Sequence, residues 1–300
     1  MKKAVILGIA GAFFFAFTFV LNKSMHLSGG NWIWSASLRY LFTLPILAVI
    51  VGQRYGFRNI HSAIGNTPKQ WLLWSTVGFG LFYAPVAFAG DHGEAWLVAA
   101  SWQITITAGV LLSPLFNTKI SMRNLAASAV ILLGVFMLQT REIHEFGASS
   151  AVYTLVPILI AAFAYPLGNR KMMRVCNSEI STMERVYGMT LCSMPFWLIL
   201  SVYGLFAKGA PSADQSFQAF LVALFSGVTA TLLFFKATDM VKTNIRWLAA
   251  VESTQAFEVI FSLLGGMLLL GEAIPDMSGI AGISLIVGGI VLNSLFSLRH

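Results

Sequence analysis

Long apolar runs constrain this chain more than any other feature. A helix needs about 20 predominantly apolar residues to cross a bilayer, and ten runs close to that length can be placed along the 300 residues. Only 10% of the residues are charged and 57% are hydrophobic, against about 25% charged in a soluble domain, so lipid must cover most of the surface. Because irregular backbone cannot face lipid, each run is predicted to be a helix. The predicted spans are 4–21, 32–51, 71–89, 95–116, 124–139, 151–168, 186–203, 217–237, 247–270 and 277–296.

The net charge of +7 is distributed unevenly between the predicted connections. If the amino terminus is cytoplasmic, the opposite side of the membrane holds only Lys23, Arg141 and Lys208 among the basic residues of the loops. Cytoplasmic loops carry an excess of Lys and Arg. We therefore expect a multi-pass protein of the bacterial inner membrane with both termini in the cytoplasm, and we expect no nucleic acid partner.

The two halves of the chain share short segments in the same order. These pairs are 22–25 with 169–172 (Asn, a base and Met in register), 35–39 with 181–185 (each ending on Arg), and 96–103 with 247–255 (Trp-Leu, then a Gln). Chance similarity between apolar segments would not place the matching segments in the same order in both halves. The pattern predicts an all-α integral membrane fold of ten transmembrane helices, in two five-helix repeats at 1–145 and 146–300. Since five is odd, the second repeat would be inverted, as in secondary transporters.

The end of the chain carries the most specific motif. Leu270-Gly271-Glu272 is followed by a glycine-studded last helix with Gly279, Gly282, Gly288 and Gly289. The chain resembles the drug/metabolite transporter superfamily, in particular its ten-helix members with two EamA-type repeats. The segment 250–258 lacks the proline of common members and is similar to the multidrug resistance efflux branch, and the first repeat has Phe-Asn-Thr-Lys where the Gly-Glu pair would stand. The resemblance implies export of drugs or metabolites.

Acidic residues within the ninth predicted span are the strongest candidates for chemistry. Glu258 and Glu252 lie inside this span, where a charge costs about 2.5–3.5 kcal/mol on translocon scales. With Gln255 they spread over one face of the helix. One interpretation is that Glu258, with or without Glu252, takes up a proton and exchanges it for a cationic substrate. The other is a permanent ion pair with a neighbouring base, for which Lys236 is the candidate.

Other polar and aromatic residues are candidates for a binding cavity. Arg39 inside the second span is interpreted as snorkelling, as pairing with the ninth helix, or as binding a substrate carboxylate. Trp102 and Gln103, in the middle of the fourth span, offer an aromatic face and an amide to a planar or cationic solute, or simply pack. Four further residues are predicted to line the cavity, of which the two asparagines are chiefly interhelical hydrogen-bonding groups: Asn22, Tyr83, Tyr165 and Asn169.

The leading hypothesis for function is a secondary active transporter that exports small molecules. No Gly-rich Walker loop exists to hydrolyse a nucleotide, so energy would come from a gradient of protons or another coupling ion. A channel and a membrane enzyme acting on a lipid-linked substrate remain alternatives. No cofactor or metal is expected, and the partners are a small-molecule substrate and membrane lipids.

Overall fold

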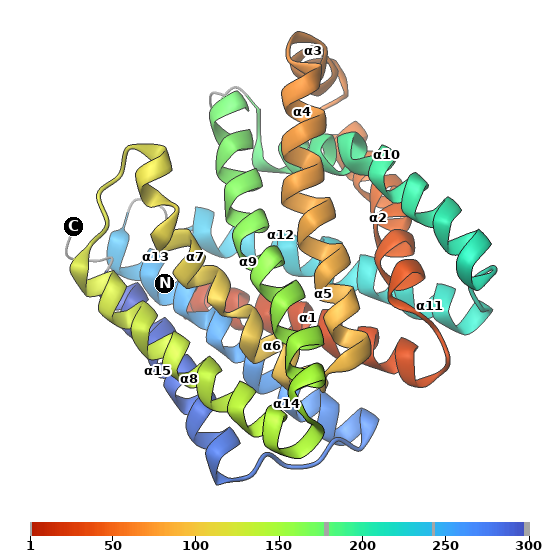
Figure 1. Ribbon diagram of the computed structural model, residues 1–300. Helices are drawn as coiled ribbons and strands as arrows, with labels where there is room; N and C mark the ends of the chain where they lie inside the picture. The colour runs from red at the N-terminus through yellow and green to blue at the C-terminus, as the bar shows by residue number, and fades with distance from the viewer. Residues whose placement is uncertain (1, 177–179, 242–243, 297–300) are drawn as a thin grey trace.

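The computed structural model describes residues 2–176, 180–241 and 244–296, and every regular element within them is helical (Figure 1). The α-helices of the first half are α1 (Lys2–Leu27), α2 (Trp32–Arg54), α3 (Arg58–Asn66), α4 (Pro68–Ser75), α5 (Leu81–His92), α6 (Ala95–Trp102), α7 (Ile104–Leu111) and α8 (Met122–Phe146). Those of the second half are α9 (Ala148–Cys176), α10 (Thr182–Lys208), α11 (Ala213–Val222), α12 (Thr231–Asp239), α13 (Ile245–Glu252), α14 (Ala256–Leu270) and α15 (Met277–Phe296). Two π-helical segments, η1 (Thr76–Gly80) and η3 (Ala223–Ala230), and two 3-10 turns, η2 (Ser113–Phe116) and η4 (Ser253–Gln255), connect them.

Nine helical segments in the described ranges are long and apolar enough to cross a membrane. They are Lys2–Leu27, Trp32–Arg54, Pro68–His92, Met122–His144, Ala148–Cys176, Thr182–Lys208, Ala213–Asp239, Trp247–Leu270 and Met277–Phe296. The all-helical membrane fold is therefore confirmed at this level.

The predicted span 95–116 is represented by a shorter apolar segment, Ala95–Leu111. It divides into α6 and α7 at Gln103, and it ends early because the 3-10 turn η2 follows, with Asn117 in the left-handed region (φ 58°). Its length is at the lower limit of about 17 residues for a spanning helix.

Polar side chains fix where several helices begin. Ser181 and Glu184 form a reciprocal capping box at the start of α10, which satisfies two backbone N–H groups that have no partner within the helix. Asn31 and Ser212 accept hydrogen bonds from backbone N–H groups at the starts of α2 and α11. These caps place helix boundaries within otherwise apolar sequence.

Small residues let the long helices approach closely. Figure 1 shows α8 and α15 side by side, and a methyl group added at Gly134 would meet the Gly282 carbonyl oxygen at 2.6 Å. Likewise, Gly168 of α9 lies directly against Gly78 of η1. Close backbone approach of this kind is typical of helix packing in lipid, where association depends on van der Waals contact.

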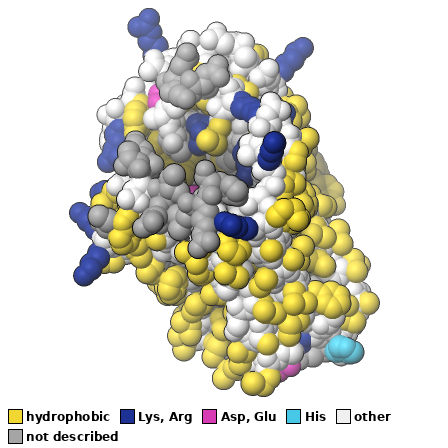
Figure 2. All heavy atoms as spheres, turned by 90° about the vertical axis from the view of Figure 1, so that its left-hand side faces the viewer, with side chains coloured by type: hydrophobic (Ala, Val, Ile, Leu, Met, Phe, Trp, Pro, Cys, Tyr) yellow, Lys and Arg dark blue, Asp and Glu magenta, His cyan; other side chains and the backbone are white. Residues whose placement is uncertain are grey.

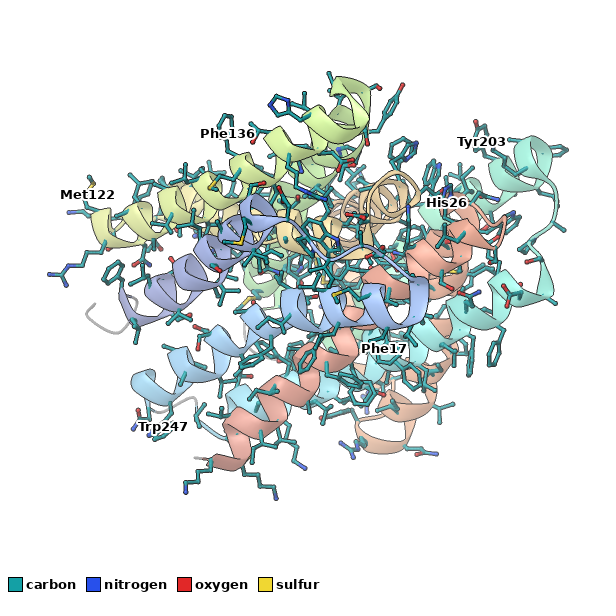
Figure 3. All side chains as sticks on the ribbon, turned by 90° about the horizontal axis from the view of Figure 1, so that it is seen from below. Phe17, His26, Met122, Phe136, Tyr203 and Trp247 are labelled. Atoms are coloured by element: carbon teal, nitrogen blue, oxygen red, sulfur yellow. The ribbon has the colours of Figure 1, made fainter. Side chains whose placement is uncertain are left out.

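Large apolar side chains cover the outside of the bundle. Phe136, Tyr203 and Met122 point outward in Figure 3, with exposed fractions of 65%, 59% and 76%. On the face drawn in Figure 2, Lys and Arg side chains gather over the upper part, while hydrophobic side chains cover the lower part. This surface is suited to lipid rather than to water.

Candidate functional site

A cavity of about 220 Å³, whose wall combines charged, polar and aromatic side chains, lies between helices from both halves of the chain. Its wall is formed by α1, α2, α5–α7, α9, α10, α12, α14 and the irregular segments η1, η3 and η4. Irregular backbone concentrates here: Phe79 lies in η1, Ser226 and Gly227 in η3, Gln255 in η4, and Gln103 at the break between α6 and α7. Such departures from the α-helix free backbone groups and re-aim side chains, and they are frequent at functional sites.

Glu258 provides the acidic wall of the cavity. It lies in the first turn of α14 and is 9% exposed. The Gln103 amide donates a hydrogen bond from Nε2 to Oε2 of Glu258 at 3.4 Å, and the same Nε2 donates to the Ala99 carbonyl oxygen at 3.2 Å. In the described part of the chain, no basic side chain forms an ion pair with Glu258.

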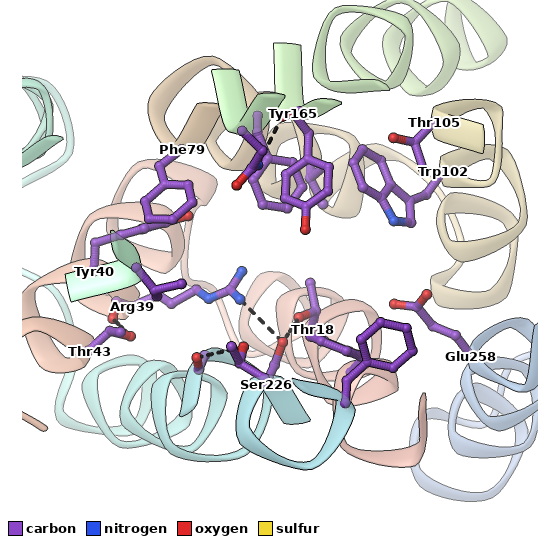
Figure 4. A pocket seen from close by; sticks show the side chains of 18 of the residues that line it. Thr18, Arg39, Tyr40, Thr43, Phe79, Trp102, Thr105, Tyr165, Ser226 and Glu258 are labelled. Atoms are coloured by element: carbon purple, nitrogen blue, oxygen red, sulfur yellow. Dashed lines mark hydrogen bonds between the residues drawn. The ribbon is translucent and has the colours of Figure 1, made fainter. Parts of the chain in front are cut away.

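Arg39 occupies the opposite wall (Figure 4). Its side chain is only 8% exposed, and its guanidinium lies 3.8 Å from the centre of the Tyr83 ring. Nη2 donates to the Ser226 hydroxyl at 3.2 Å, and this hydroxyl is also hydrogen-bonded to Thr18. Nη1 is buried and has no hydrogen-bond partner among the residues that the structure describes. Arg39 is therefore fixed in place with one donor group still free.

A second guanidinium lines the same cavity. Arg185, in the first turn of α10, is partly buried, and its Nε is buried without a hydrogen-bond partner in the described part of the chain. Arg185 aligns with Arg39 in the predicted repeat, but it is not among the site residues predicted from the sequence. The signal that could have found it was this alignment, because equivalent positions of a duplicated fold are expected to face the same interior.

Aromatic rings form the remaining wall. The rings of Trp102, Tyr165 and Phe82 contact one another, with centroid separations of 4.8–5.7 Å. Tyr40 stacks on Trp197 at 4.3 Å and meets Phe79 at 5.6 Å. These flat apolar surfaces can bury the hydrocarbon or aromatic part of a solute.

The structure places the sequence-predicted residues in two groups. Those that line the cavity are Arg39, Trp102, Gln103, Tyr165, Asn169, Gln255 and Glu258. Glu252 and Lys236 are exposed and do not line it, and no ion pair joins Lys236 to either glutamate among the described residues. Asn22 and Tyr83 are buried behind the wall, where they hydrogen-bond to each other at 3.2–3.3 Å.

At one end of the bundle, hydrogen bonds join the ends of neighbouring helices and one connecting segment. This end, here called the sealed end, carries the connections 28–31, 93–94, 209–212 and 271–276. Glu272 accepts a hydrogen bond from the Ala95 N–H at 2.7 Å, and Asp91 accepts one from the Trp32 N–H at 2.9 Å. The cavity extends away from the sealed end, towards the start of α10 at Arg185.

The described ranges contain no group of three or more His, Cys, Asp or Glu side chains arranged to hold a metal ion. Cys176 and Cys192 are free thiols in different helices.

The described ranges contain nine helices that are long and apolar enough to cross a membrane, and several of them enclose a cavity with charged side chains, so the chain is a multi-pass membrane protein. The model of the EmrE family, described as "Putative multidrug resistance efflux transporter", matches residues 2–299. The chain belongs to this family of membrane transporters, which confirms the resemblance seen in the closing motif and in the segment 250–258.

Two bacterial relatives align over most of the chain. "Uncharacterized protein YjlA" of Bacillus subtilis (strain 168) is 46% identical over 308 aligned positions, which cover 98% of this chain and 95% of that protein. "Uncharacterized 42.1 kDa protein in intracellular alkaline protease 3'region" of Shouchella clausii is 45% identical, with 86% and 70% of the two chains covered. A solved chain described as "Crystal structure of protein" matches with a TM-score of 0.63 over 100% of this chain and 99% of that one. At 13% identity it shows a shared fold alone.

Proposed function

We propose that this transporter is a secondary active exporter that moves small drugs or metabolites across the bacterial inner membrane through the central cavity. The observation that carries the proposal is Glu258: a carboxyl group that is 9% exposed, lines a cavity between both halves, and forms no ion pair with a base in the described chain. Ionisable groups inside membrane proteins are costly and usually mark a transport or proton pathway.

Glu258 would act as the exchange site for a coupling proton. In the empty cavity its ionised form lacks a compensating cation, so a proton neutralises it. A substrate bearing a cationic group would replace that proton, because the single negative charge of the Glu258 carboxylate is compensated either by the proton or by the cation. The Gln103 amide would orient the carboxyl group in both states through its hydrogen bond to Oε2.

An inverted repeat of residues 1–145 and 146–300, with Ala95–Leu111 as a tenth span, would supply the two alternating states. The helix contacts support this, because they occur in pairs that are equivalent under the repeat. The α5–α9 contact corresponds to the α12–α1 contact, and the α4–α10 contact corresponds to the α11–α2 contact. The pairs α8–α15 and α2–α10 map onto themselves. The irregular segments also correspond, with π-helices in the third and eighth spans.

The sealed end would face the periplasm and both termini the cytoplasm. The charge distribution supports this orientation, because the connections of the sealed end hold few Lys or Arg residues. The cavity would then be reached from the cytoplasm, as an exporter requires, and opening the sealed end would release the substrate outside.

Counterflow in proteoliposomes tests the proposal against its alternatives. An exporter exchanges labelled for unlabelled solute with saturation, and an imposed proton gradient drives net movement. A channel would show no saturable exchange, and an enzyme acting on a lipid-linked substrate would alter the molecule. Either of these results would exclude secondary transport.

A further inference from the structure

The cavity contains more positive than negative charge. Among the described residues that line it, the charged ones are Arg39, Arg185 and Glu258, two guanidinium groups and one carboxyl group. A simple lipophilic cation would gain one attractive partner here and meet two repulsive ones. The solute that fits must therefore carry negative charge as well.

Arg39 indicates where that negative charge binds. Its Nη2 donates to Ser226, but Nη1 has no partner in the described ranges, and the residue is more than nine-tenths buried. A buried donor left unpaired is costly, and a guanidinium is shaped to bind a planar carboxylate through several N–H groups. Arg185, the second arginine of the cavity wall, also has a buried Nε without a hydrogen-bond partner among the described residues.

Glu258 indicates where the positive charge binds. Figure 4 shows its carboxyl group across the cavity from Arg39, and the two side chains form no ion pair with each other in the described chain. A solute that spans the space can therefore pair with both. The aromatic wall of Trp102, Tyr165 and Phe82 would cover the apolar atoms between its charged ends.

We infer that the cavity binds a small organic zwitterion whose carboxylate is held by Arg39 and whose ammonium group faces Glu258. This inference rests on the proposed transport function and adds the class of substrate to it. It requires the two charges of the solute to be separated by an apolar linker, because the two binding groups lie on opposite walls.

Ligand binding to the purified full-length chain in detergent tests the inference without requiring transport. The probes are the ω-amino acids from 3-aminopropanoate to 8-aminooctanoate, each compared with the fatty acid and the alkylamine of the same chain length, and tetraphenylphosphonium is the lipophilic cation. We expect at least one ω-amino acid to bind at least about tenfold more tightly than both of its singly charged analogues, since hydrogen bonds to charged groups contribute about 1.5–3 kcal/mol.

Substitutions identify the two binding groups. Arg39→Gln should weaken binding of the zwitterion about tenfold or more, and it should leave binding of the alkylamine unchanged or make it tighter. Glu258→Gln should weaken binding of the zwitterion and leave binding of the fatty acid unchanged. Arg39→Lys keeps the positive charge but loses the planar guanidinium group. Its affinity for the zwitterion should therefore lie between those of Arg39→Gln and wild type. The matched control is Arg54→Gln, because Arg54 is an exposed arginine of the same helix, α2.

Three results would overturn the inference: no ω-amino acid binds, an alkylamine or tetraphenylphosphonium binds more tightly than every ω-amino acid, or Arg39→Gln behaves as Arg54→Gln does. If tetraphenylphosphonium binds more tightly than every ω-amino acid and shows counterflow, the transport function stands and the substrate class is wrong. If a zwitterion binds but shows no counterflow, the binding site stands and transport is wrong.

Discussion

Gln103 donates a hydrogen bond to Glu258 at 3.4 Å, although the two residues lie 155 positions apart in the chain. The amide comes from the break between α6 and α7 in the first half, and the carboxyl group from the first turn of α14 in the second. Each side chain lines the cavity where its helix departs from regular geometry or begins again. The site is thus assembled from the two halves jointly, and neither half contains it alone.

Replacing Glu258 by Gln should abolish transport driven by a proton gradient and leave the protein folded. The amide keeps the shape of the side chain but cannot take up or release a proton. Since no base among the described residues is paired with Glu258, the unfolding free energy should change by less than about 1 kcal/mol, rather than the 3–5 kcal/mol typical of a broken buried ion pair. Uptake into proteoliposomes and thermal unfolding in detergent measure the two effects.

Glu252→Gln is the matched control, because Glu252 is an exposed glutamate six residues earlier that does not line the cavity. It should retain wild-type uptake. Undiminished, pH-dependent uptake by Glu258→Gln would reject the exchange role, and equal loss in both variants would point to a general effect of charge in this segment.

Glu272 should make the stability of the protein depend on pH. Burial raises the pKa of Glu272 above its ordinary value of 4.5, and the hydrogen bonds from the backbone N–H groups of Ala95 and Trp96 only partly oppose this. Because the folded-state pKa lies above the unfolded one, the stabilising contribution is complete below pH 4.5 and is lost as pH rises through the folded-state pKa. Glu272→Gln should flatten this decline in thermal unfolding measured against pH.

Asp276, in the same connection, provides a control of opposite sign. Hydrogen bonds from the Gly279 N–H and the Ser278 hydroxyl lower the pKa of Asp276 below its ordinary 3.8. Its contribution is therefore present above pH 3.8 and lost only in stronger acid, so Asp276→Asn should not alter the decline assigned to Glu272. A decline that survives in Glu272→Gln would show that another group is responsible.

Gly168→Ala should destabilise the packing of α9 against η1. An added methyl group would contact the backbone of Gly78 directly and lie 2.8 Å from the Trp74 carbonyl oxygen, so backbone would have to move. We expect a loss of about 1–3 kcal/mol in unfolding free energy, measured by denaturant titration in detergent. Gly288→Ala is the control: nothing lies within 4 Å of the added methyl group, so stability should stay equal or rise by about 0.5–1 kcal/mol. Equal effects of the two substitutions would disprove the close contact.

The orientation can be tested by cysteine labelling. In a variant with Cys176→Ser and Cys192→Ser, a single cysteine is introduced as Arg58→Cys or as Lys208→Cys, at two exposed positions. With both termini in the cytoplasm, a membrane-impermeant maleimide added to intact cells should label Lys208→Cys only, and Arg58→Cys only after lysis. The reverse pattern would invert the topology, and labelling of both in intact cells would refute the arrangement of spans.

Hydropathy predicted the helices well and the site only in part. Spans such as 32–51 and 277–296 correspond to Trp32–Arg54 and Met277–Phe296, because burial in lipid depends on local composition. The segment 95–116 was predicted too long, since composition does not register the turn at η2. Helical periodicity placed Glu252 and Glu258 on one face, yet η4 interrupts the helix between them and only Glu258 lines the cavity.

The sequence by itself determined that the chain lies in a membrane, which apolar segments are helical, and which family the chain belongs to. Each of these depends on short-range composition or on motifs. Only the tertiary structure decided that Arg185, Ser226 and Thr18 join Arg39 at one cavity, and that Lys236 stays outside it. The physical reason is that the direction of a side chain depends on helix rotation and on π-helical and 3-10 irregularities, which are set by contacts between distant segments.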